Sequence, residues 1–576
     1  MKKSILSLSA AVALGGLGLV STASAIVVYD NTSAPIGAPN GTPPTAGTAM
    51  LQHPAGTGHI LLVPYFSAQG SNATLINIVN TDAVNGKAVK VRFRGASNSD
   101  DLLDFTLLMS PGDVWSGSVS VGNDGVAKIT HAGDETTCTL PRANSGYWNP
   151  EDSGGLSAPF NTLRLPNIGT PGQALLTREG YVEILNMADI WPDAAAGSVF
   201  TNIKHVANVA PCGATLDELA SEEVLNNTDA NKRYDIASPT CGLMGSWTIL
   251  NQEQMGAYSG AQTAMIITAE TMGPSGTVAS AAGGIAFFPQ VEDKYGTADP
   301  TTSGTNPNLW SVTADPLLVG GALAAVAVDA TTQTFGSTHV LAPVTALWYD
   351  LPDLSTPMVI ATYTTPQQQA DALAATLVKG NVMNEWMSYN GAVPFNTDWV
   401  VSQPTRRYHV AVDYAGNRAL WSDGADPTNS AKQSVPTYVG YADAVLNSTA
   451  YGPMVCMTYG ITAVNREEGS NVKTQGPSFS PGQRVTTGTC GEVFTVQFGT
   501  TSVLAAVDTP TSVAGTVAPL GGAGWAQLTV TSPSAELAGG LPTLGYAAIQ
   551  FNNGTTSKIY NMTFPHRWTG SSNYSD

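Results

Sequence analysis

Short runs in which apolar and polar residues alternate recur along most of this chain. In the run KAVKVRFRG, three apolar residues alternate with three cations. The apolar residues are Val89, Val91 and Phe93, and the cations are Lys90, Arg92 and Arg94. Successive side chains of a β-strand point to opposite faces, so this two-residue period predicts a strand with its apolar side chains in a core and its cations in solvent.

Similar runs follow one another with turn-forming residues between them. They include HILLVPYF, NATLINIVN, LLDFTLLM, TAMIITAE, EVFTVQFG and LGYAAIQFNN. Asn85-Gly86 is a strong hairpin signal, because both residues accept a positive φ. Capping-box patterns predict two helices, which begin near Thr215 and Thr365. No tandem repeat of fixed period is evident. The expected fold is therefore mainly β: a multidomain antiparallel β-sandwich, immunoglobulin-like or jelly-roll-like, with a few short helices.

The chain is long enough for more than one core, and its composition divides it into segments. The expected segments are 1–25, a signal peptide; 26–52, a strand and a Pro/Gly-rich linker; 53–293, a β-sandwich domain with a helical insertion; 294–426, a middle α+β segment; and 427–576, a C-terminal β domain. The two inner boundaries lie at Gly/Pro/Thr-rich breaks near Asp293 and Asp426. Strands from different segments can still share a sheet, because sandwich connections are often non-local.

The first 25 residues predict export. Lys2 and Lys3 precede an apolar run that ends with small residues at Ala23 and Ala25, as in a cleaved secretory signal. Cleavage would remove both lysines and change the formal charge from -19 to -21. This acidity argues against nucleic acid and anionic membranes as partners and favours divalent cations. No later segment is expected to span a membrane, so the protein is predicted to be extracellular or on the cell surface.

An exported chain can form disulfide bonds between its cysteines. Proximity in the sequence predicts two bonds, Cys212 to Cys241 and Cys456 to Cys490, and leaves Cys138 as the odd cysteine among five. Connectivity does not follow from sequence alone. Cys138 is expected to be buried, and the alternative is a bond to another chain.

The three cations allow a second interpretation besides a solvent face. Lys90, Arg92 and Arg94 would bind an acidic glycan, or the acidic surface of a neighbouring subunit, if they lay together on an exposed strand. Partial neutralisation by nearby carboxylates is the simpler expectation, because cross-strand ion pairs are common in antiparallel sheets.

Those nearby carboxylates are Asp100, Asp101 and Asp104, in the oxygen-rich segment SNSDDLLD. Calcium prefers such carboxylate and carbonyl clusters, so the segment is a candidate calcium site. It does not follow the D-x-[DN]-x-[DN]-G pattern, and Asp and Asn are also ordinary turn residues. Both interpretations stay open at this point.

Catalytic signatures are missing from the sequence. It contains no G-x-S-x-G, H-E-x-x-H, C-x-x-C or phosphate-binding glycine motif, and its seven histidines lack a zinc-ligand pattern. Aromatic residues in strand patterns, such as Trp115 and Trp247, are expected in cores. Tyr147 and Trp148 lie in a loop pattern and are candidates for sugar binding. A non-enzymatic protein is therefore expected. A hydrolase with an unrecognised pair of acidic residues is a weaker hypothesis than either of the two non-enzymatic functions given below.

Three stretches together resemble a known group of proteins. They are HILLVPYF through GDVWSGSVS, TDWVVSQPTRRYHV, and GLPTLGYAAIQFNNG. In their strand texture they resemble large surface-layer-like exported proteins of Gram-negative bacteria. This resemblance implies an envelope location and transfers no functional residue. The prediction is a structural cell-surface protein that assembles with itself into a layer or filament, and the alternative is a secreted adhesin or glycan-binding module that contacts envelope glycans.

Overall fold

The structure is a computed structural model that describes two long parts of the chain. The first part is 49–268, without 134–135, 144–145, 163–164, 167, 220–235, 238, 252 and 254–255. The second is 375–570, without 390–393, 405–411, 414–417, 420–444, 469–484, 500, 506–511, 514–521, 531–539 and 553–558. Three short strands are also described: β1 (Val27–Tyr29), β17 (Ile285–Phe287) and β18 (Tyr349–Asp350). The expected signal peptide and most of the middle segment lie outside these residues.

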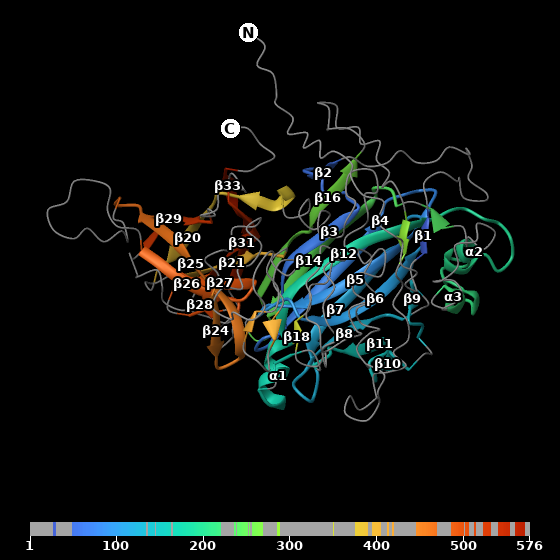
Figure 1. Cartoon of the computed structure of the whole chain (residues 1–576), viewed down its shortest axis with the longest axis horizontal. Helices are drawn as coiled ribbons and strands as arrows, with labels where there is room; N and C mark the ends of the chain where they lie inside the picture. The colour runs from blue at the N-terminus through green and yellow to red at the C-terminus, as the bar shows by residue number, and fades with distance from the viewer. Residues whose placement is uncertain are drawn as a thin grey trace, which may run out of the picture.

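The first part folds into an antiparallel β-sandwich of two sheets (Figure 1). One sheet has the order β10 (Asn149–Pro150), β11 (Leu156–Pro159), β8 (Ala127–His131), β7 (Val114–Val121), β4 (Asn72–Asn80), β14 (Leu243–Asn251), β15 (Gly256–Ala261). The other has the order β2 (Ala49–Gln52), β16 (Thr263–Thr268), β3 (Ile60–Ser67), β12 (Glu179–Ile190), β5 (Gly86–Gly95), β6 (Asp101–Met109), β9 (Cys138–Leu140), with β13 (Ile236–Ala237) beside β12. Three short helices complete this part: α1 (Thr170–Leu176), α2 (Val199–Ile203) and α3 (Thr215–Glu218).

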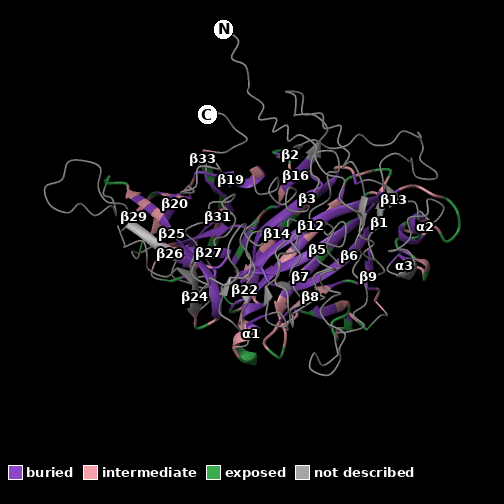
Figure 2. Ribbon diagram, in the orientation of Figure 1, coloured by how far each residue is buried: buried purple, intermediate pink, exposed green. Residues whose placement is uncertain are grey.

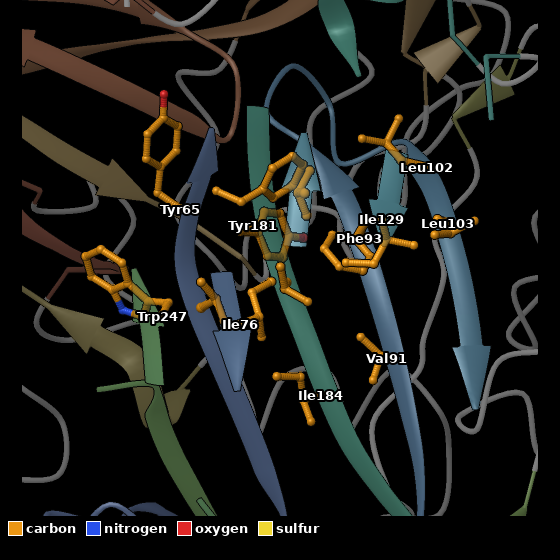
Figure 3. Packing of buried hydrophobic residues seen from close by; sticks show 14 of the residues in the cluster. Tyr65, Ile76, Val91, Phe93, Leu102, Leu103, Ile129, Tyr181, Ile184 and Trp247 are labelled. Carbon is orange, nitrogen blue, oxygen red and sulfur yellow. The ribbon is translucent and has the colours of Figure 1, made fainter. Parts of the chain in front are cut away.

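Apolar side chains from both sheets fill the space between them. Ile76, Trp115 and Ile129 of the first sheet and Val91 and Phe93 of the second belong to one buried cluster. Figure 3 shows part of this cluster, and Figure 2 shows that most of both sheets is buried. Burial of this apolar surface is the main stabilising contribution to the sandwich.

The second part forms another sandwich. Its larger sheet has the order β24 (Val445–Thr449), β25 (Gly452–Asn465), β29 (Gly522–Thr529), β20 (Asn381–Ser388), β33 (Arg567–Thr569), with β26 (Val485–Cys490) beside β25. Its smaller sheet has the order β28 (Ser512–Val513), β27 (Val493–Gln497), β21 (Phe395–Ser402), β31 (Leu544–Asn552), β32 (Ile559–Pro565). The remaining short pairs are β1 with β17; β18 with β22 (Val412–Asp413) and β23 (Arg418–Ala419); and β19 (Val378–Lys379) with β30 (Leu541–Pro542).

The central strands of the smaller sheet, β21 and β31, are buried on both faces over most of their length and join the two sandwiches. On β21, Trp399 and Val401 enter the core of the second sandwich, whereas Val400 between them belongs to the core of the first. On β31, Ala547 belongs to the core of the second sandwich and Tyr546 to the core of the first. This explains why the runs WVV and YAAI lack alternation, since a strand buried on both faces has no solvated side.

Hydrogen bonds reinforce this junction. Tyr181 Oη donates to the carbonyl oxygen of Pro404 (2.9 Å), and Asn72 Nδ2 donates to that of Leu504 (2.8 Å). The sheets also extend across the boundary expected near Asp426, because β20 and β21 precede it and pair with strands that follow it. The described residues on the two sides of this boundary therefore share a core.

The interpretation of Lys90, Arg92 and Arg94 as a solvent face is wrong, since all three are fully buried. Strand β5 lies inside its sheet between β12 and β6, and these neighbours supply carboxylates to the cationic face. Arg92 Nε lies 3.0 Å from Asp104 Oδ1 and its Nη1 lies 3.4 Å from Glu183 Oε2, which also lies 3.3 Å from Arg94 Nε. The alternation identified two faces of the strand, and both faces turn out to be buried.

One expected disulfide bond is present and the other is wrong. Cys456 and Cys490 are bonded across the neighbouring strands β25 and β26, as predicted. Cys212 is bonded to Cys138, and Cys241 is a free, half-buried thiol. Sequence proximity failed here because β9 carries Cys138 to the edge of its sheet, where the segment between α2 and α3 lies against it in the same buried cluster.

Candidate functional site

A cleft of about 440 Å³ lies where the two sandwiches meet. We call it the inter-sandwich cleft. One wall comes from β2, β14, β15 and β16 of the first sandwich, with residues such as Gln52, Trp247 and Gln262; the other comes from β19, β31, β32 and β33 of the second, with residues such as Lys379 and Trp568. A volume of this size lies in the range of about 300–1,000 Å³ that is usual for small-molecule sites.

The floor of the cleft is aromatic and rigid. The rings of Trp247 and Tyr546 lie 4.6 Å apart with an angle of 32° between them, and both side chains are almost fully buried. Trp247 Nε1 donates to the carbonyl oxygen of Ala261 (3.2 Å). Gly545, beside Tyr546, has a φ of +150°, and a Cβ atom there would lie 1.9 Å from the carbonyl oxygen of Val400. The close approach of β31 to β21 at the floor therefore requires glycine.

His566 is also in the cleft, but both of its ring nitrogens are engaged. Asn384 Nδ2 lies 3.0 Å from Nδ1, and the carbonyl oxygen of Val400 lies 2.9 Å from Nε2. Nε2 therefore donates and Nδ1 accepts, which is the neutral tautomer. Burial lowers the pKa of His566 to about 4. This histidine supports the wall of the cleft and is neutral at physiological pH.

Lys379 supplies the positive charge of the cleft. Its Nζ lies 3.4 Å from Gln52 Oε1 and 4.2 Å from the centroid of the Trp568 ring. Among the described residues it makes no ion pair, and burial lowers its pKa to about 8. None of the described residues that line the cleft is acidic, although the chain has 43 acidic and 24 basic residues other than histidine. An ammonium group held by an amide and an aromatic ring keeps donors available for an anion.

Asp100, Asp101 and Asp104 do not lie together in an exposed turn, as a calcium site at this segment would require. Asp104 lies within β6 and is paired with Arg92, and Asp100 is buried beside the end of β5. Asp101 is the register partner of Arg94 across the two strands. In the described part of the chain, no three His, Cys, Asp or Glu side chains are grouped so as to hold a metal ion. Calcium binding stays a prediction, without support from these aspartates.

The other sequence candidates are also structural. The Lys90, Arg92 and Arg94 face has no exposed surface on which a glycan or an acidic partner could dock. Tyr147 Oη donates to the carbonyl oxygen of Asp104 (2.6 Å), and Trp148 Nε1 donates to that of Pro141 (2.8 Å). Trp148 is buried in the core of the first sandwich, so it does not offer a face to a sugar.

Sequence reasoning missed the inter-sandwich cleft. Trp247 was expected in a core, which the structure confirms, but its position at the cleft floor depends on β31, about 300 residues away. Lys379 and Trp568 lie in unremarkable sequence, VKG and HRWTG. The only local signal was a tryptophan next to a cation in the latter.

Comparisons of this chain with protein-family models, with curated proteins and with solved structures find no match. None of the described helices has the length and apolar character needed to cross a membrane.

Proposed function

We propose that this protein is a non-enzymatic structural protein of the cell surface, exported and assembled with copies of itself into a filament or layer. The observation that carries the proposal is a pair of exposed apolar rows on different ends of one body. Contiguous exposed apolar surface is typical of protein contacts.

The first row lies on the outer face of the first sandwich, where β4 ends and where β7 and β14 begin. Val114, Val79 and Met244 are direct register neighbours across β7, β4 and β14. Val114 is 53% exposed and Met244 is 43% exposed. Val84, in the adjacent turn, is 54% exposed and extends the apolar surface. We call Val79, Val114 and Met244 the valine row.

The second row lies on the second sandwich and is aromatic. The ring centroids of Phe395 and Phe551 are 4.9 Å apart, and those of Phe551 and Tyr560 are 5.7 Å apart. The backbone of Tyr389 forms an antiparallel β-bridge with that of Phe395. Tyr389 is 52% exposed and Tyr560 is 61% exposed. We call these four residues the aromatic row. Like the valine row it crosses three neighbouring strands, here β21, β31 and β32.

The two rows lie near opposite ends of β14. Met244 is next to its start, whereas Asn251 at its end pairs with Gly256, which lies against Asn561 beside Tyr560. Strand β4 begins at Asn72, which contacts the second sandwich through Leu504, and carries Val79 roughly 23 Å away at about 3.3 Å per residue. Contact between the valine row of one copy and the aromatic row of the next is heterologous, and a heterologous contact repeats into a chain or a ring. The smaller sheet of the second sandwich packs in both cores, so the valine row and the aromatic row keep a fixed position relative to each other.

Three further features support an extracellular building block. The two disulfide bonds fit an oxidising compartment. The first 25 residues have the pattern of a secretory signal, and three stretches resemble surface-layer-like exported proteins. Acidic surfaces bridged by calcium would strengthen contacts between copies.

The test uses lysines placed in each row. One variant carries Val114→Lys and Met244→Lys, and another carries Tyr389→Lys and Tyr560→Lys. The matched control carries Ser116→Lys and Ser246→Lys, two exposed positions on the face of the valine row but outside it. Particle mass is measured by light scattering after size-exclusion chromatography, with and without calcium, and particles are inspected by negative-stain microscopy.

We expect the native chain and the control to form large ordered particles and each row variant to stay monomeric. A mixture of the two row variants should form dimers only, because each retains one intact row of the heterologous pair. A native chain that is monomeric at every concentration, or row variants that still assemble, would overturn the proposal.

A binding module is the second candidate function, and the inter-sandwich cleft is the observation that favours it. An adhesin needs an accessible site with a defined chemistry, and the buried cations of β5 do not provide one. The inter-sandwich cleft does provide one.

A further inference from the structure

We infer that the inter-sandwich cleft binds a carboxylate-bearing saccharide, with Lys379 as the anion-binding residue and Trp568 as the sugar-stacking residue. This inference is independent of self-assembly, because neither residue belongs to the valine row or the aromatic row. It assigns a ligand class to a site that the sequence did not reveal.

The anion subsite follows from the surroundings of Lys379. The residue is 3% exposed and lines the cleft. Burying an ammonium group without an opposite charge costs stability, and folded proteins normally pair such a group. Gln52 and the Trp568 ring are its contacts among the described residues, so Nζ has unused donor capacity. A carboxylate of a ligand that enters the cleft would complete the ion pair.

The saccharide follows from the groups around that cation. Trp568 is 38% exposed, and one face of its ring is taken by Lys379. Indole rings offer a broad apolar surface at low entropic cost, which suits the C–H face of a sugar ring. Gln52, Ser259 and Thr563 line the same cleft with amide and hydroxyl groups, and neutral groups of this kind hydrogen-bond to sugar hydroxyls.

The site is also prepared before a ligand binds. Trp247 and Tyr546 are locked against each other at its floor, and His566 is fixed by Asn384 and Val400. A preformed wall lowers the entropic cost of binding. Because the walls come from both sandwiches, the cleft exists only in the intact chain.

The test is isothermal titration of the full chain with trigalacturonate, with trimers of glucuronate and mannuronate, with a carboxyl-reduced neutral trimer, and with acetate. Lys379→Met removes the charge and keeps the apolar stem, Lys379→Arg keeps a cation, and Trp568→Ala removes the ring. Lys128→Met is the matched control, since Lys128 lies on β8 outside the cleft, paired with Glu151 (2.6 Å). Thermal unfolding of each variant checks that it is folded.

We expect at least one acidic trimer to bind, and Lys379→Met to weaken that binding about tenfold or more, as for loss of a charged hydrogen bond. Lys379→Arg should retain part of the affinity, Trp568→Ala should weaken acidic and neutral trimers alike, and Lys128→Met should change neither. Three results would overturn the inference: no acidic trimer binds, acetate binds as tightly as the trimers, or Lys379→Met binds like the native chain.

Discussion

Asp398 lies on β21, fully buried at the junction of the two sandwiches. Its Oδ2 accepts hydrogen bonds from Ser502 Oγ (2.5 Å), Val503 N (2.9 Å) and Leu504 N (3.1 Å). Burial nevertheless dominates and raises the pKa of this carboxyl group from 3.8 to about 6. The carboxyl group therefore holds the segment after β27 against β21. Because it is buried, its charged form destabilises the folded state more than its neutral form does.

The pH dependence of stability should report this carboxyl group. Its folded pKa exceeds its unfolded pKa, so the folded state holds an extra proton between about pH 4 and pH 6. Above pH 6 the carboxyl group is charged in the folded state, and its burial lowers the free energy of unfolding by the full amount. This destabilisation decreases as the pH falls from about 6 to about 4. Relative to Asp398→Asn, the native chain should gain on the order of 1 kcal/mol in unfolding free energy between pH 7 and pH 5.

Urea denaturation at the two pH values measures this difference. The asparagine variant keeps an acceptor for the backbone amides of Val503 and Leu504 and lacks the titration. An unchanged difference between the two proteins at pH 7 and pH 5 would contradict the assigned cause.

At the scale of secondary-structure elements, ion pairs connect β5 to β6 and β12. Replacing Arg92 by methionine leaves Asp104 and Glu183 buried without this partner. Removal of one member of a buried ion pair typically costs about 3–5 kcal/mol, so Arg92→Met should lower the free energy of unfolding by that order. Lys128→Met breaks a partly exposed pair on β8 and should have a small effect. Equal midpoints for Arg92→Met and the native chain in urea would show that the pairs contribute nothing.

Strand positions could be predicted from sequence better than their surroundings could. KAVKVRFRG correctly predicted β5, because the two-residue period is a local property. The hairpin expected at Asn85-Gly86 is wrong: β4 and β5 lie in different sheets, and neither residue has a positive φ. Thr215 correctly marked the start of α3, which is only one turn long in the described residues. The cations were placed in solvent because polarity alone does not show that Asp104 and Glu183 lie opposite them. The pairing of Cys138 with Cys212 was missed for the same reason, since it needs the path of β9.

For the whole molecule, the shared sheet predicts that both sandwiches unfold together. Val400 and Tyr546 belong to the core of the first sandwich, and their neighbours Trp399 and Ala547 belong to the core of the second. Chains of this size usually unfold in several steps. We expect one main transition in differential scanning calorimetry, and Tyr546→Ala should shift all of it downward, because it removes a buried ring from the junction.

An exposed position on the second sandwich provides the control. Glu385→Gln, on the outer face of β20, should leave the transition unchanged. Two separate transitions, with Tyr546→Ala shifting only one of them, would show that the sandwiches fold independently.

The sequence by itself determined a mainly β chain, the run that forms β5, and the placement of Trp115 and Trp247 in cores. Proximity in the sequence also predicted the disulfide between Cys456 and Cys490, although the same rule gave a wrong partner for Cys212. These properties depend on residue period and local proximity, which act over a few residues or between neighbouring strands. Only the tertiary structure decided that the cations of β5 are buried, that Cys138 pairs with Cys212, and that Lys379, Trp568 and Trp247 meet in one cleft. Such contacts join strands hundreds of residues apart, and side-chain packing between sheets sets them in ways that no local pattern records.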